Sequence, residues 1–273
     1  MLRIICSGDI GFFYQPAHGL ATAALRRGRR GNGSVWWMSD RFRLNPGLDV
    51  AALRALFDRD GRVEIRDFLA PDAAARLRAH LLARHDWKLV LNAGDKVYEM
   101  PRGAIDALDP AQREELEARS IAAARDGFHF RYEAIRVPDD PAARSSPLDD
   151  FVGFLSSPKV IDLLRAITGI GDLDYADGQA TAYSPGHYLT RHDDNVDGKQ
   201  RRAAYVLGLS PGWRPEWGGL LMFHRPDGHV EEAFVPTMGA LRLFAVPALH
   251  SVSYVTPMAP EPRLSVTGWL RYG

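Results

Sequence analysis

The sequence predicts an α+β fold in which helices support a double-sheet jelly roll. Helical spacing of apolar residues dominates up to residue 176, and short strand-like segments separated by turns dominate from residue 177. Strands that follow one another without intervening helices favour two packed antiparallel sheets over a parallel sheet with crossovers. The 273 residues, of which 46% are hydrophobic, are sufficient for one large core.

Composition excludes several classes of function. Lys+Arg and Asp+Glu both number 34, so no global basic field exists to attract nucleic acid, and no direct nucleic-acid partner is expected. A single cysteine, Cys6, excludes a disulfide framework and a thiolate metal cluster, which makes the cytoplasm the expected compartment. No apolar run reaches the length of a membrane span, so no membrane partner is expected.

The chain divides into an extension and one domain. Residues 1–40 carry four arginines between Arg26 and Arg30, followed by a Gly-Asn-Gly-Ser stretch, and are expected to form a disordered or loosely docked extension. Residues 41–273 are expected to form a single domain. Within it, residues 41–176 provide helical support, and residues 177–273 form the jelly-roll core with the active site.

Local signals predict the elements of the supporting part. Helices are expected over residues 49–58, from Pro71, from Pro110, and over residues 151–167 with a break near Ser157-Pro158. Residues 62–69 should form a short strand, and residues 87–97 should be extended. The apolar stripes of these elements indicate core packing.

Eight strands are predicted in the second part, most of them bounded by turn residues such as Pro226-Asp227-Gly228. They are Gly178–Tyr183, Tyr188–His192, Arg202–Leu209, Gly219–His224, His229–Val235, Ala240–Val246, His250–Thr256 and Arg263–Arg271. Eight short strands in this order suit a cupin-like jelly roll.

The triplet His192-Asp193-Asp194 is the sharpest local feature. Alternate side chains of a strand share a face, so His192 and Asp194 are expected to point the same way and Asp193 away. A second histidine from a distant strand, His250, would complete a facial triad that suits non-haem Fe(II) and leaves positions open for oxygen and a co-substrate.

Arg263 opens the next strand, with Ser265 on the same face. A 2-oxoacid dicarboxylate would chelate iron at one end, and its far carboxylate would need a bidentate cationic partner, which arginine provides better than lysine. The remaining histidines receive other interpretations: His187 is expected at the surface or in support of the site, and His224 and His229 are expected to be exposed beside a hairpin.

The segment from Gln179 to Arg271 resembles the prolyl-hydroxylase-like branch of the iron- and 2-oxoglutarate-dependent dioxygenases, and more closely its ribosomal prolyl hydroxylases and their bacterial relatives. The matching pieces span about a third of the chain in the right order. They are Tyr183-x-x-Gly186-x-x-Leu189-x-x-His192-x-Asp194, Arg201-Arg202, Trp217-Gly218-Gly219-x-Leu221, Leu243-Phe244-x-Val246-Pro247, His250-Ser251-Val252 and Arg263-Leu264-Ser265-Val266-Thr267-Gly268-Trp269.

The resemblance implies a double-stranded β-helix, with His192, Asp194 and His250 as iron ligands that serve catalysis. It implies that Arg263 binds the 5-carboxylate of 2-oxoglutarate, helped by Ser265 and Tyr183. The implied cofactor and co-substrates are Fe(II), 2-oxoglutarate and O2, with ascorbate as an optional stimulant. One position departs from the pattern: many relatives carry a second tyrosine where Gly208 stands, and Tyr205 lies three residues earlier.

The function expected first is hydroxylation of a prolyl residue in a protein or peptide partner. The alternative is hydroxylation of a free amino acid or another small molecule. A catalytically inactive binding module is disfavoured because all ligand residues and the arginine are present, and a hydrolytic metalloprotein is disfavoured because such chemistry does not require Arg263.

Overall fold

A computed structural model describes residues 3–5 and 41–273, and of residues 3–5 only the backbone. Most of the predicted extension, residues 1–40, therefore lies outside the described residues, and its role stays a prediction. The exception is strand β1 (Arg3–Ile5), which pairs antiparallel with β4 (Lys96–Pro101).

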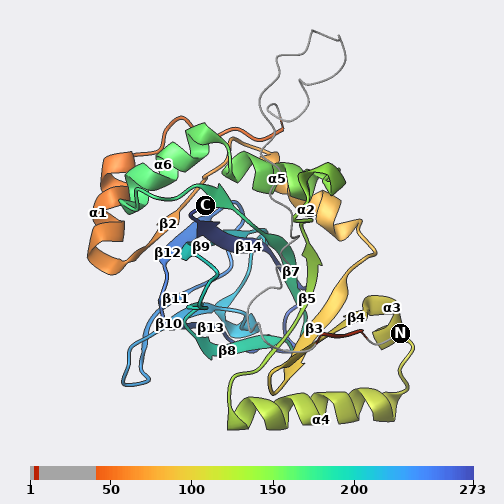
Figure 1. Cartoon of the computed structure of the whole chain (residues 1–273). Coiled ribbons are helices and arrows are strands. Elements are labelled where there is room, and N and C mark those ends of the chain that lie inside the picture. The colour runs from red at the N-terminus through yellow and green to blue at the C-terminus, as the bar shows by residue number, and fades with distance from the viewer. Residues whose placement is uncertain (1–2, 6–40) are drawn as a thin grey trace, which may run out of the picture.

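The strands form one curled antiparallel sheet that folds over into two layers, which confirms the predicted α+β jelly roll (Figure 1). Along its main path the order is β11-β10-β13-β8-β5-β7-β14-β9-β12-β2, with β3 and β4 continuing from β5 and β6 pairing with β14. The bounds are β2 Arg62–Ile65, β3 Lys88–Ala93, β5 Phe130–Arg136, β6 Tyr175–Ala176, β7 Gln179–Tyr183, β8 Tyr188–His192, β9 Arg201–Gly208, β10 Leu221–His224, β11 Val230–Phe234, β12 Leu241–Ala245, β13 His250–Val252 and β14 Arg263–Arg271.

Helices cover the outer face of the layer that contains β7, β14 and β9, and α4 lies on the opposite side of the molecule (Figure 1). Their limits follow from local chemistry: Asp49 caps α1 through the amide of Ala52, and Gly61 ends it in the left-handed region at φ 67°. The helices are α1 Val50–Asp60, α2 Ala73–Leu82, α3 Arg102–Asp106, α4 Pro110–Asp126, α5 Pro147–Leu155 and α6 Pro158–Thr168, with 3-10 turns at Pro141–Ala143 and Pro215–Trp217.

The main core lies between these helices and the outer face of the sheet. Along β9, Ala203, Tyr205 and Leu207 point into that core, where they meet helix residues such as Phe151 and Leu164. Alternation therefore turns the intervening residues of the same strand to the inner face. The helices thus stabilise the sheet from outside and leave its inner face for a site.

Two differences from the sequence prediction concern the supporting part. The extended stretch 87–97 is a hairpin of β3 and β4, and a further strand, β5, joins it to the jelly roll. β5 has no alternating pattern because it is buried on both faces, and its Glu133 is neutralised by Arg102 at 2.6 Å. The supporting part also agrees with the prediction at one point, because the break expected near Ser157-Pro158 separates α5 from α6.

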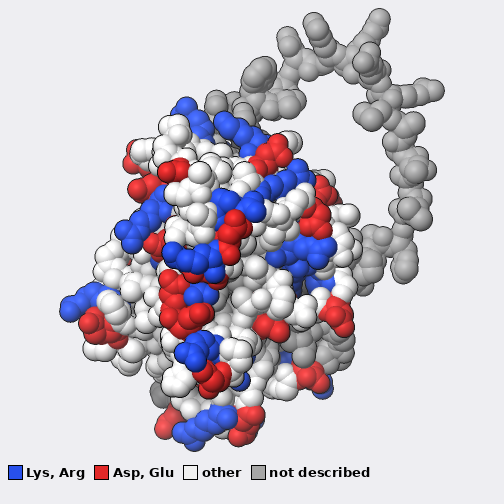
Figure 2. All heavy atoms as spheres, turned by 90° about the vertical axis from the view of Figure 1, so that its left-hand side faces the viewer, with Lys and Arg blue, Asp and Glu red and all other residues white. Residues whose placement is uncertain are grey.

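The surface carries both signs of charge. On the face with α1 and the β10–β11 hairpin, basic and acidic side chains alternate (Figure 2), as in the pair of Arg62 with Glu232 at 2.6 Å. This agrees with the zero net charge. None of the helices in the described part of the chain has the length and apolarity required to cross a bilayer.

Candidate active site

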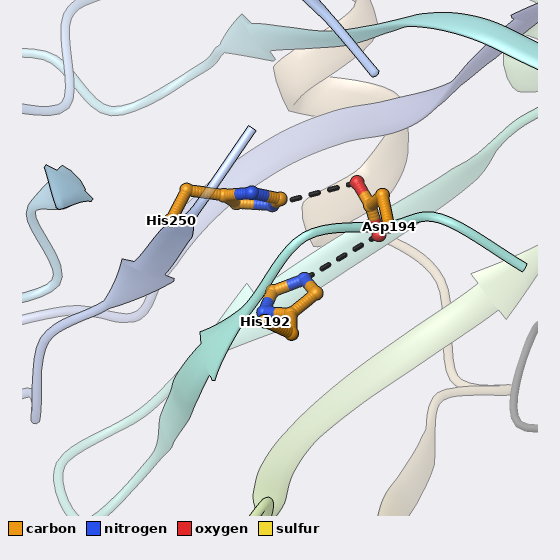
Figure 3. Close-up of side chains that lie close together, drawn as sticks. All are labelled: His192, Asp194 and His250. Atoms are coloured by element: carbon orange, nitrogen blue, oxygen red, sulfur yellow. Dashed lines mark ion pairs between the residues drawn. The ribbon is translucent and has the colours of Figure 1, made fainter. Parts of the chain in front are cut away.

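Three side chains that could hold a metal ion converge between the two layers: His192 at the end of β8, Asp194 just after it, and His250 at the start of β13 (Figure 3). One ligand atom from each lies within 4.8 Å of the other two. Nε2 of His192 and Nε2 of His250 each lie 3.4 Å from a different oxygen of Asp194. Two imidazoles and one carboxylate arranged in this way form the ligand set typical of non-haem Fe(II).

A turn, rather than strand alternation, brings Asp194 to this position. β8 ends at His192, and Asp194 adopts a left-handed backbone conformation with φ 63°, which aspartate tolerates better than most residues. The side chain of Asp193 accepts a hydrogen bond from the amide of Asn195 instead of joining the group. The expected pairing of His192 with Asp194 is therefore present, but the geometric reason given for it was wrong.

The main chain fixes the orientation of both imidazoles. Nδ1 of His192 lies 3.0 Å from the carbonyl oxygen of Thr190, and Nδ1 of His250 lies 2.7 Å from that of Ala248. If each Nδ1 carries a proton and donates to its carbonyl, each Nε2 presents a lone pair toward Asp194. Neutral imidazoles with free Nε2 atoms are the form that binds a metal ion.

The protonation of the group also suits a metal. Burial and the neighbouring His192 lower the pKa of His250 to about 4, so its ring is neutral at pH 7. Burial opposes ionisation of Asp194. At low pH, where both histidines carry an added proton, a hydrogen bond from His192 and the two positive charges hold the pKa of Asp194 below the ordinary value. At neutral pH the site therefore offers one anionic and one neutral ligand without prior loss of a proton.

Arg201 holds the turn that carries Asp194. Its Nη1 donates to the main-chain oxygen of Asp194 at 3.0 Å, and its guanidinium lies 3.6 Å from the ring centroid of Trp269. The residue is 9% exposed, and burial lowers its pKa to about 10. The sequence pattern included Arg201, but only the structure shows that it contacts the turn at the metal group.

The three residues expected to bind 2-oxoglutarate lie together at the other end of the pocket. Arg263 stands opposite Tyr183 in the pairing of β14 with β7, and its guanidinium lies 5.0 Å from the centre of the Tyr183 ring. Ser265 is one step along the same face, and its hydroxyl shares a 2.8 Å hydrogen bond with Thr181.

Arg263 is the clearest sign that this end accepts an anion. The residue is 3% exposed, and its Nε is buried without a hydrogen-bond partner. No carboxylate among the described residues forms an ion pair with it, and burial lowers its pKa to about 10, so it remains charged. An unpaired buried charge is costly, which a carboxylate ligand would relieve.

One pocket connects the two groups. Its volume is about 560 Å³ including the part open to solvent. Besides the expected residues it is lined by Trp269, which ends the matching sequence pattern, and by Tyr132, Thr181 and Gln179, which were not singled out from the sequence. Tyr132 stacks on Tyr183 with ring centroids 5.3 Å apart, and it was missed because β5 was not predicted.

The other histidines lie outside the metal group. His187 is buried rather than at the surface: its Nδ1 accepts from the amide of Ser184 at 3.1 Å, and burial lowers its pKa to about 3. His224 is half-buried, with Nε2 2.7 Å from the hydroxyl of Ser251, while His229 is exposed as expected.

The departure at Gly208 has a steric cause. A β-carbon at this position would collide with the main-chain oxygen of Thr237, so no side chain fits there. Tyr205 does not replace the missing tyrosine, because it points to the outer core and its hydroxyl donates to the carbonyl oxygen of Asp177. The space beside Gly208 is therefore occupied by main chain.

Comparison with known proteins agrees with this geometry. The sequence profile of the 2OG-Fe(II) oxygenase superfamily matches residues 178–271, which include all six expected site residues. Prolyl 3-hydroxylase OGFOD1 of Mus musculus is 32% identical over 145 residues, covering 50% of this chain and 24% of that protein. Prolyl 3-hydroxylase sudestada1 of Drosophila melanogaster is 30% identical over 151 residues, covering 50% of this chain and 27% of that protein.

The match thus spans about a quarter of the length of these two relatives. Among solved structures, a prolyl-4-hydroxylase of Pseudomonas putida is similar in fold, with a TM-score of 0.53, 23% identity, and coverage of 82% of this chain and 99% of that chain. Residues 178–271 are therefore similar to the 2OG-Fe(II) oxygenase superfamily, whose members use Fe(II), 2-oxoglutarate and O2, and two relatives of this chain are named prolyl 3-hydroxylases.

Proposed function

We propose that this protein is an Fe(II)- and 2-oxoglutarate-dependent dioxygenase that hydroxylates a prolyl residue of a protein or peptide. One observation carries the proposal: the group of His192, Asp194 and His250 opens into the same pocket as the buried, unpaired guanidinium of Arg263. A metal ligand set at one end and an isolated cation at the other suit a chelating dicarboxylate.

Each residue has a defined task in this proposal. The two Nε2 atoms and the carboxylate of Asp194 hold Fe(II), and Arg201 keeps the turn of Asp194 in place. Arg263 binds the far carboxylate of 2-oxoglutarate, with the hydroxyls of Tyr183 and Ser265 beside it. Bound Fe(II) with 2-oxoglutarate and O2 supplies the conversion of a substrate C–H to C–OH, with succinate and carbon dioxide as the other products.

The walls of the pocket exclude water from the reacting centre. Leu189, Leu221, Phe244 and Val252 line it from both layers and would shield the side of the metal group from solvent. The substrate enters from the side not closed by Arg263. This arrangement lets the protein position the target C–H bond while the cofactor supplies the chemistry.

The choice of a prolyl substrate rests on the relatives, since two proteins that are at least 30% identical over half of this chain are named prolyl 3-hydroxylases. A free amino acid or another small molecule is the alternative substrate. The compartment proposed is the cytoplasm, because one cysteine in 273 residues is typical of a reducing environment.

The test measures succinate formation from 2-oxoglutarate by the Fe(II)-loaded protein, with prolyl peptides, protein fractions or free proline added. Peptides or proteins should stimulate turnover and gain one oxygen atom on proline, detected by mass spectrometry. Asp194→Asn should abolish this activity, and Asp193→Asn is the matched control, since that side chain points away from the group. Stimulation by free proline alone would favour the small-molecule alternative, and equal activity of both variants would refute the site.

A further inference from the structure

A second cavity adjoins the active-site pocket. Its volume is about 1050 Å³ including open solvent, and three residues, Gln179, Thr267 and Trp269, line both spaces. Its remaining walls come from the ends of β5 and β14 and from the segment before β7, and they carry the charged residues Arg136, Asp139, Arg144, Asp177 and Arg271. None of these charged residues has a task in the mechanism above.

Gln179 stands at the boundary between the two cavities with one unused hydrogen-bonding atom. The residue is 4% exposed, and its Oε1 is buried without a hydrogen-bond partner. A buried carbonyl oxygen without a donor is unfavourable, so the folded protein presents an acceptor that a ligand would satisfy.

Gln179 lies away from the residue expected to hold 2-oxoglutarate. In the antiparallel pairing of β7 with β14, Tyr183 stands opposite Arg263 and Gln179 opposite Thr267. Four residues of a strand extend about 13 Å. Gln179 is therefore at the far end of this face from Arg263 and beside the second cavity, where its Oε1 is available to a molecule that enters through that cavity.

We propose that Gln179 is a substrate-positioning residue whose Oε1 accepts a hydrogen bond from a main-chain N–H flanking the target prolyl residue, and that the substrate chain continues into the second cavity. The inference rests on the proposed function. A prolyl residue within a chain has no N–H of its own, so the nearest donors are the amides of the residues on either side.

The walls of the second cavity suit a peptide chain. Arg271 forms an ion pair with Asp177, and Arg144 donates to the carbonyl oxygen of Pro138 at 2.8 Å. The protein thus holds these arginines in place. Together with Asp139 and Asp177 they give the cavity walls both positive and negative charges. Such walls favour the alternating donors and acceptors of a main chain over an apolar metabolite.

The experiment compares prolyl peptides that differ only in one main-chain N–H. In one peptide an ester oxygen replaces the N–H of the residue after proline, and in another it replaces the N–H of the residue before it. Each is assayed for hydroxylation with the wild-type protein, with Gln179→Met, and with Gln112→Met, which makes the same chemical change on helix α4 away from both cavities.

For the wild type, one of the two esters should lower kcat/KM by about five- to tenfold, the size of one hydrogen bond to a neutral acceptor. In Gln179→Met the same ester should change kcat/KM by less than about twofold, while Gln112→Met should keep the wild-type ratio. Because the result is a ratio within each variant, a general loss of activity in Gln179→Met does not imitate it.

The inference is wrong if each ester lowers kcat/KM by the same factor in the wild type and in Gln179→Met. It is also wrong if neither ester lowers kcat/KM in the wild type. Either result leaves the proposed function standing, since the peptide is still hydroxylated. If no prolyl peptide or protein is hydroxylated by the wild type, the proposed function has failed, and this inference falls with it.

Discussion

Replacing Arg263 by methionine should have opposite effects on co-substrate binding and on stability. Methionine keeps much of the side-chain volume but removes the guanidinium. Loss of a buried charge partner costs on the order of 2–5 kcal/mol of binding free energy. The dissociation constant for 2-oxoglutarate should therefore rise by about 30-fold or more, at about tenfold per 1.4 kcal/mol.

The effect on stability follows from burial of an unpaired charge. Burial lowers the pKa of Arg263 from 12.5 to about 10, which corresponds to a penalty on the order of 3 kcal/mol for the charged form in the folded protein. The nearby ring of Tyr183 recovers part of that penalty. Without ligands, Arg263→Met should therefore unfold at a temperature at least equal to that of the wild type, and higher by about 2–4 °C for each kcal/mol gained.

Arg242 provides the matched control. It is 2% exposed on strand β12, which β9 separates from β14, but its Nη2 lies 2.7 Å from a carboxylate oxygen of Glu64. Arg242→Met should lower the unfolding temperature, because it leaves Glu64 without this partner.

The assay is thermal unfolding of each variant without ligands, followed by titration of the Mn(II)-loaded protein with 2-oxoglutarate in the absence of oxygen. Wild-type affinity in Arg263→Met, or destabilisation equal to that of Arg242→Met, would refute the reasoning. Either outcome would mean that the Arg263 guanidinium has a protein partner rather than a ligand.

Alanine at His192, Asp194 or His250 should reduce the iron that remains after desalting, measured by metal analysis, because each change removes one of three ligands; wild-type iron content would contradict the assignment. Burial lowers the pKa of His187 to about 3, so as the pH falls the unfolded chain is protonated at this residue before the folded protein. The free energy of unfolding should therefore decline between pH about 6.5 and 3, by at most about 5 kcal/mol from this group. His187→Asn should flatten that decline in urea unfolding at stepped pH, and an unchanged slope would assign it to other groups. A chain that begins at Phe42 should fold and turn over 2-oxoglutarate despite losing the pairing of β1 with β4, whereas aggregation would show that the removed segment docks.

The sequence was most informative where strands alternate between two faces and end in turns. All eight segments predicted after residue 177 are strands, and β8 has the predicted bounds. β13 is shorter than predicted because residues 253–256 do not pair with β8. They contact the 3-10 turn Pro215–Trp217 instead, where the main-chain N–H of Thr256 donates to the carbonyl oxygen of Trp217. The supporting half was less predictable, since β5 carries three charged residues. One of them, Glu133, is buried, which its pairing with Arg102 makes favourable.

The site, like the fold, could be predicted from the sequence only in part. His192, Asp194, His250 and Arg263 belong to types whose chemistry is visible in a sequence, and their spacing indicated a metal and an anion. Gln179 is uncharged and belongs to no motif. Its importance depends on the register of β7 against β14 and on an oxygen left without a partner, and neither is encoded in local sequence.

The close approach of Thr237 to Gly208 limits how position 208 can change. The backbone of the segment between β11 and β12 occupies the space where a side chain at position 208 would begin. A single substitution by tyrosine does not fit, because the loop would first have to move. Position 208 and this loop are therefore expected to change together in evolution.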